Sequence, residues 1–108
     1  MKATITEWKN RVHQNAVEHG WWEEPREMGT LLMLIVTEVA EAMEEYRNNK
    51  AHVYTVDGKP EGIASELADC IIRVLDICGK YDIDIERAVE VKHAYNKTRA
   101  YKHGGKQA

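Results

Sequence analysis

Acidic residues recur at helical spacing in two separate stretches of the sequence. Glu38 and Glu41 lie in TEVAEAMEEYR, directly after the apolar run LLMLIV. Glu66 and Asp69 lie in ELAD. Each pair has the i, i+3 spacing that places two side chains on one face of a helix. Carboxylates brought together repel one another and raise each other's pKa, so a group of four needs a cation, and oxygen ligands suit Mg²⁺ or Mn²⁺. The spacing predicts a metal centre.

A solvated helix face rich in glutamate is the competing interpretation of the first stretch. At about 100° per residue, Glu38, Glu41 and Glu45 fall within a sector of about 60°. This sector borders the apolar positions Leu31 and Ala42 and does not lie opposite them. The acids of the second stretch flank apolar positions in the same way. Two such helices packed antiparallel would bring their carboxylates together, which favours the metal centre over the solvated face.

A third stretch, VKHAYNKTRAYKHGG, carries Lys92, Asn96 and Arg99 at i, i+4 and i+7. Two cations and an amide on one helix stripe could bind phosphate oxygens and neutralise developing charge. The competing interpretation is that cations are favoured near a helix C-terminus. Arg73 lies four residues after Asp69; an ion pair between these two is the simpler expectation for it, and a contact with phosphate is the alternative.

The elements that must position these residues are helices. Helical periodicity and turn residues predict helices over about residues 4–19, 27–48, 60–79 and 85–99. Between the second and third helices, HVYTV and DGKP indicate a short extended arm or hairpin. A polar tail follows from about residue 100. The fold class predicted is an all-α bundle that forms a single domain over 1–108.

Apolar residues mark the expected core. In the helix over 27–48 the expected core stripe consists of Leu32, Ile35, Val39, Met43 and Tyr46. The helix over 60–79 is apolar on more than one side, with Ile72 and Leu75 on its outer side. A helix of this kind is usually buried on more than one side, which favours a subunit interface.

Composition excludes several classes of protein. The net charge of -3 over 108 residues disfavours binding to a nucleic-acid polymer, which needs a basic surface. The longest apolar run is far shorter than the roughly 20 residues that span a bilayer, and no signal segment opens the chain. A cytoplasmic protein with no membrane partner is expected. Cys70 and Cys78, eight residues apart on one helix, are too distant to bridge.

EVAEAMEE followed by ELADCIIRVLDI resembles the MazG-like, all-α nucleoside triphosphate pyrophosphohydrolase superfamily, whose signature is ExxE, a variable gap and ExxD. Here the signature residues are Glu38, Glu41, Glu66 and Asp69. The resemblance implies a four-helix fold, dependence on Mg²⁺, and cleavage of a nucleoside triphosphate to the monophosphate and pyrophosphate. It also implies a homodimer or homotetramer with sites near subunit interfaces. Thr37 stands where some relatives have a further acid.

The resemblance also implies roles for the other candidates. Asn96 would lie near the metal, and Lys92 and Arg99 near the phosphates. Trp21 and Trp22 are candidates to contact the base. Trp8 is a further candidate, and hydrogen bonds to the base are expected from Asn10, His13 or Gln14.

The chemistry expected is in-line attack of water on the α-phosphorus, with Glu38 the first choice to accept the proton. Which base and sugar are preferred stays open. Two alternatives also stay open: an enzyme like phosphoribosyl-ATP pyrophosphohydrolase, and a non-catalytic helical module that only binds nucleotide or a partner protein.

Overall fold

The computed structural model describes residues 2–99. Its helices are α1 (Ile5–Glu18), α2 (Met28–Arg47), α3 (Ile63–Lys80) and α4 (Ile85–Lys97), and a hairpin of β1 (Tyr54–Val56) and β2 (Lys59–Glu61) joins α2 to α3. The all-α class is confirmed, with this hairpin as the one short sheet among the described residues. The tail expected from about residue 100 lies outside the described residues.

Capping side chains set the starts of three helices. At α1, Thr4 accepts a hydrogen bond from the backbone N–H of Glu7, whose own carboxylate accepts from the N–H of Thr4. This reciprocal capping box satisfies two N–H groups that a helix start leaves free. The carboxylates of Glu27 and Asp84 cap α2 and α4 in a similar way. These helices accordingly begin within one residue of the predicted starts.

The hairpin displaces the predicted start of the third helix. Asp57 and Gly58 both have positive φ, 51° and 80°, as a type I′ turn requires. The turn pairs Thr55 with Pro60 in β2. The prediction that α3 starts near Pro60 was therefore wrong by three residues. A proline lacks an N–H but is tolerated in a short edge strand.

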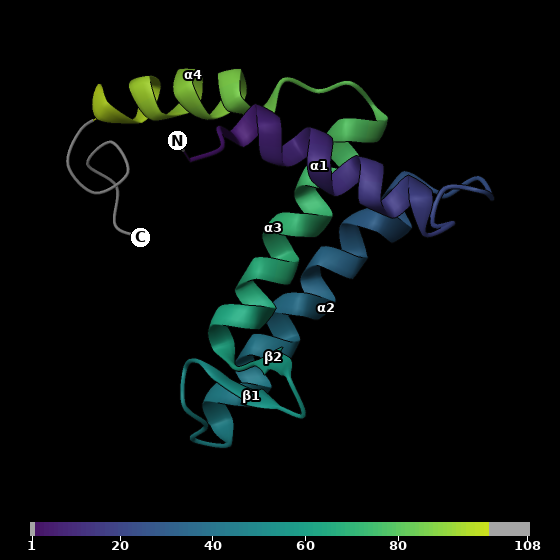
Figure 1. Ribbon diagram of the computed structural model, residues 1–108. Helices are drawn as coiled ribbons and strands as arrows, with labels where there is room; N and C mark the ends of the chain where they lie inside the picture. The colour runs from purple at the N-terminus through teal and green to yellow at the C-terminus, as the bar shows by residue number, and fades with distance from the viewer. Residues whose placement is uncertain (1, 100–108) are drawn as a thin grey trace.

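The α2–α3 pair is the frame of the molecule (Figure 1). The two helices lie side by side and antiparallel, and α1 crosses the end at which α2 begins and α3 ends. The fourth helix contacts α1, where the Glu86 carboxylate accepts a hydrogen bond from the N–H of Thr6, and then extends away from the α2–α3 pair. No residue of α4 is buried. The described part of one chain therefore packs three helices together and leaves the fourth outside.

The core differs from the predicted stripe. Among the described residues, the buried apolar ones are Ala16, Leu31, Ala42, Leu75, Ile77 and Cys78. The prediction that Leu32, Val39, Met43 and Tyr46 form the core stripe of α2 was wrong for one chain, because these side chains are 52–65% exposed. Helix α2 instead buries Leu31 and Ala42. Leu75, expected on the outer side of α3, is buried, and both cysteines are free.

A glycine lets α1 approach α3 closely. A Cβ atom built at Gly79 would collide with the Cβ of His13 on α1. Because α1 carries residues of the cavity described below, this contact helps to position the candidate site.

Gly79→Ala is expected to lower the free energy of unfolding by about 1–3 kcal/mol, since the added methyl group forces α1 and α3 apart. Urea unfolding followed by circular dichroism measures this. An unobstructed glycine inside a helix shows the opposite sign, a gain of up to about 1 kcal/mol on replacement by alanine. A stabilised variant would contradict the close approach.

Candidate metal centre

Three carboxylates from two helices meet at the seam of the α2–α3 pair. Glu38 comes from α2, and Glu66 and Asp69 come from successive turns of α3. One carboxylate oxygen of each lies within 4.8 Å of those of the other two. The donor set is therefore three hard oxygen ligands, which fits Mg²⁺ or Mn²⁺.

The electrostatics of this cluster oppose full ionisation. The pKa of Glu66 is raised above its usual value, first by burial, then by a hydrogen bond shared with Glu38 and by the charges of Asp69, Glu38 and Glu41. The pKa of Asp69 is also raised, first by burial and then by the charge of Glu38, against the lowering effect of Arg73 and Lys59. A divalent cation would remove this penalty by neutralising the carboxylates.

Arg73 pairs across the helices and not along its own helix. Its Nε–H donates to Oε1 of Glu38 at 2.9 Å. The prediction of an ion pair with Asp69 was wrong. Glu38, on α2, lies across the seam and is the carboxylate that pairs with the Arg73 guanidinium. The Glu38 side chain is 13% exposed and that of Arg73 is 36% exposed.

The other two acids of the first stretch lie outside this cluster. Glu41 is exposed and belongs to neither acidic group found among the described residues. Glu45 belongs to a second group with Glu61 and Glu66. It accepts the hydrogen bond of the Tyr54 hydroxyl at 2.8 Å, which raises the pKa of Tyr54 to about 12. Glu45 is thus hydrogen-bonded to a tyrosine of the hairpin.

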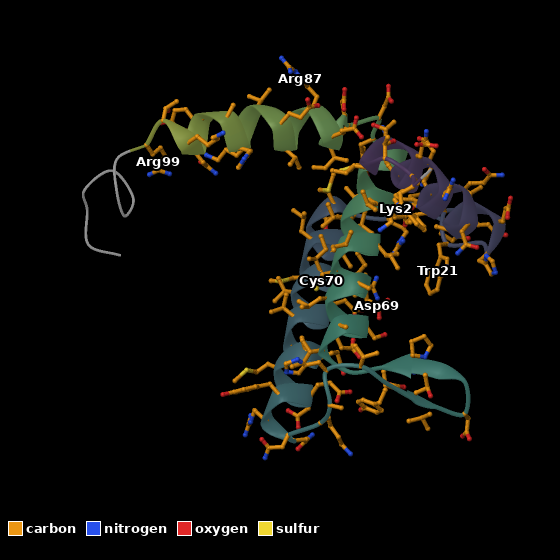
Figure 2. All side chains as sticks on the ribbon, turned by 60° about the vertical axis from the view of Figure 1, so that its left-hand side comes forward. Lys2, Trp21, Asp69, Cys70, Arg87 and Arg99 are labelled. Carbon is orange, nitrogen blue, oxygen red and sulfur yellow. The ribbon has the colours of Figure 1, made fainter. Side chains whose placement is uncertain are left out.

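A cavity of about 470 Å³ opens beside the cluster, between α1, its connector to α2, and α3. Its lining is mixed in charge: α1 and the connector contribute arginines and tryptophans, and α2 and α3 contribute the acids together with Arg73. Figure 2 shows Asp69 on α3 on the side of the helix pair where Trp21 lies. The lining residues are Trp8, Arg11, Val12, Asn15, Ala16, Trp21, Arg26, Glu38, Asp69, Ile72, Arg73 and Asp76.

The two candidate base-binding tryptophans have different surroundings. Trp21 lines the cavity and is 62% exposed, and its ring already has the Arg26 guanidinium 5.8 Å from its centroid. Trp22 donates its indole N–H to Oδ1 of Asp76 at 2.9 Å, and Nδ1 of His13 lies 2.8 Å from the same oxygen. This network fixes Trp22 as part of the scaffold, and the Arg26 guanidinium lies over both indole rings.

Sequence reasoning missed two of the three arginines that line the cavity, Arg11 and Arg26. Arg11 and Asn15 lie on α1 at i+3 and i+7 from Trp8, and all three line the cavity. That helical spacing was available in the sequence and could have identified this face of α1. Arg26 lies in the connector, where no periodicity indicates which way its side chain turns.

The phosphate stripe of α4 is not brought to the acids within one chain. Lys92 and Asn96 line a separate, open cavity of about 410 Å³ whose other lining residues also come from α4. Arg99 lies at the far end of α4, distant from Asp69 (Figure 2). Within one chain these residues therefore lie apart from the acidic cluster.

Comparison with known proteins gave no match to a family model, a curated protein or a solved structure. None of the helices described is long and apolar enough to cross a membrane. What this site could do therefore rests on its geometry and on the motifs of its own sequence.

Glu66→Gln is expected to flatten the pH dependence of stability in the metal-free protein. Because the folded pKa values of Glu66 and Asp69 are raised, the folded state binds their protons more tightly than the unfolded state does. These two groups thus make stability fall as pH rises from the ordinary carboxyl range through the raised values. Urea unfolding in a chelator, from about pH 4.5 to about pH 7.5, measures the slope.

The matched control is Glu90→Gln, which removes the same charge from an exposed position on α4. It should leave the slope of the wild-type protein unchanged. Equal slopes for Glu66→Gln and the wild-type protein would show that the cluster is not electrostatically crowded.

Proposed function

We propose that this chain is a Mg²⁺-dependent nucleoside triphosphate pyrophosphohydrolase of the MazG-like kind, which cleaves an NTP or dNTP to the monophosphate and pyrophosphate. The observation that carries the proposal is a single cavity that combines acids and cations. Glu38 and Asp69 come from α2 and α3, and Arg11 and Arg26 come from α1 and its connector to α2. A metal-bound polyphosphate needs both kinds of group close together.

The metal ligands proposed are Glu38, Glu66 and Asp69, because these three supply oxygens to one place. Glu41, the fourth acid of the motif, is proposed as a ligand that joins when the ion binds, since its charge already acts on Glu66. Bound Mg²⁺ would neutralise phosphate charge and lower the pKa of the attacking water.

The chain's own residues are proposed to orient the nucleotide. Trp21 offers an exposed ring for the base, and Asn15 an amide for hydrogen bonds. Arg11 and Arg26 lie where guanidinium groups could bind phosphate oxygens. Glu38 accepts a proton from the attacking water at the α-phosphorus. The phosphoryl transfer is then mostly a matter of positioning and charge neutralisation.

A homodimer or homotetramer belongs to this proposal. Large apolar side chains are exposed at helical spacing along both α2 and α3, and a cluster of exposed apolar residues is typical of a contact surface. Its residues are Leu32, Val36, Val39, Met43, Tyr46, Leu67 and Ile71. In such an assembly Lys92, Asn96 and Arg99 of one copy would contact phosphates held by another.

Asp69→Asn is expected to lower Mg²⁺-dependent pyrophosphate release by about 100-fold or more, because it removes one anionic ligand and unbalances the other two. The assay is pyrophosphate release from a panel of standard and modified NTPs and dNTPs, with phosphoribosyl-ATP included. Helicity should be retained. Glu90→Gln is the charge-matched control with wild-type activity. Full activity of Asp69→Asn would overturn the assignment of the site.

Val39→Glu is expected to prevent self-association, since a carboxylate in the middle of the apolar face would be buried without a partner charge. Sedimentation velocity measures the mass of the species in solution. Val56→Glu places the same charge at a similarly exposed valine of the hairpin and should leave the mass unchanged. A wild-type chain that sediments as a monomer would contradict the interface.

A further inference from the structure

Arg73 both pairs with an acid of the cluster and lines the cavity. Its Nε–H is hydrogen-bonded to Oε1 of Glu38 at 2.9 Å, and its side chain also lines the cavity in which the nucleotide is proposed to bind. Glu38 is the more enclosed partner, with 13% of its side chain exposed against 36% for Arg73. The guanidinium is therefore the more solvent-accessible partner of the pair.

Arg73 is the cation of the acidic cluster in the metal-free state. Among the described residues it forms the one ion pair with a member of the cluster, while Lys59 pairs with Glu61. Its charge also lowers the pKa of Asp69. Enclosed carboxylates at this spacing require a positive charge, and the chain itself supplies it.

A divalent ion at the same cluster would meet this guanidinium as a like charge. Both would seek the Glu38 carboxylate, and at contact distances in a partly enclosed site their repulsion is far stronger than in bulk water. Arg73 projects from α3 one turn after Asp69, with over a third of its side chain in contact with solvent. Because the Arg73 side chain is the more exposed partner and lines the cavity, its rotation into the cavity is the movement that would break the ion pair.

We propose that Arg73 is an exchangeable counter-ion of the metal centre: it holds Glu38 in the metal-free protein, is displaced when Mg²⁺ binds, and then donates to phosphate oxygens of the nucleotide in the cavity. This inference rests on the proposed function. It adds a coupling, because Mg²⁺ binding frees the group that binds phosphate, and phosphate binding removes the competitor of Mg²⁺. Coupling of this kind is reciprocal.

Calorimetric titration of the metal-free protein with Mg²⁺ alone tests the competition. Arg73→Gln should bind Mg²⁺ about 3- to 10-fold more tightly than the wild-type protein, since a partly enclosed charge pair no longer has to be broken. Arg87→Gln removes the same charge from an exposed position on α4, far from Asp69 (Figure 2), and should leave Mg²⁺ affinity unchanged. Unchanged or weaker Mg²⁺ binding by Arg73→Gln would mean that Arg73 only orients Glu38, which overturns the proposal.

Nuclear magnetic resonance of the wild-type protein tests the displacement without relying on a variant. The Arg73 Nε–H signal, identified by its loss in Arg73→Gln, should move on Mg²⁺ addition toward that of a solvent-exposed arginine. Adding a non-hydrolysable nucleotide should shift it again. A signal that stays unchanged at saturating Mg²⁺ would show that the ion pair persists, and the proposal would be wrong.

These outcomes separate the two proposals. A wild-type protein that releases pyrophosphate with Mg²⁺ while Arg73 keeps Glu38 overturns only the exchange. A wild-type protein that binds no Mg²⁺ overturns the exchange and the proposed function together.

Discussion

Repulsion among carboxylates at the α2–α3 seam is the constraint on which the rest of the site depends. Packing two amphipathic helices antiparallel is an ordinary way to bury apolar surface, but here it also gathers Glu38, Glu66 and Asp69 within a few ångströms. Burial and mutual charge raise the pKa values of Glu66 and Asp69. Such a seam costs stability unless a cation joins it, and Arg73 offsets only part of the charge. The contacts that build the helix pair thus also assemble the carboxylates of the proposed metal site.

The sequence predicted the parts of this centre that depend on helical spacing alone. The i, i+3 pairs and their position beside apolar residues were enough to place Glu38, Glu66 and Asp69 on facing helices. The partner of Arg73 was not predictable in the same way. Spacing along α3 favours an ion pair with Asp69, but the register between α2 and α3 brings Glu38 within hydrogen-bond distance. The role of Trp22 was hidden for a related reason: its indole bonds to Asp76, 54 residues away.

The misplaced core stripe has a physical explanation too. Helix α2 is apolar over two adjacent sectors, and periodicity alone does not say which sector faces the partner helix of the same chain. Leu31 and Ala42 are buried, while Val39 and Met43 are exposed. The position of α4 is likewise set by the short link at residues 81–84, where Asp82 adopts a φ of 53°. An unburied helix and a bare apolar face in one chain are both consistent with the proposed assembly.

Electron paramagnetic resonance of Mn²⁺, used as a stand-in for Mg²⁺, tests the central claim most directly. Free hexaaqua Mn²⁺ gives a sharp signal that is lost on binding to protein. The account predicts that the metal-free wild-type protein removes this signal saturably, that Mg²⁺ restores it by competition, and that Asp69→Asn removes much less of it. A wild-type protein that leaves the free Mn²⁺ signal unchanged would contradict the account.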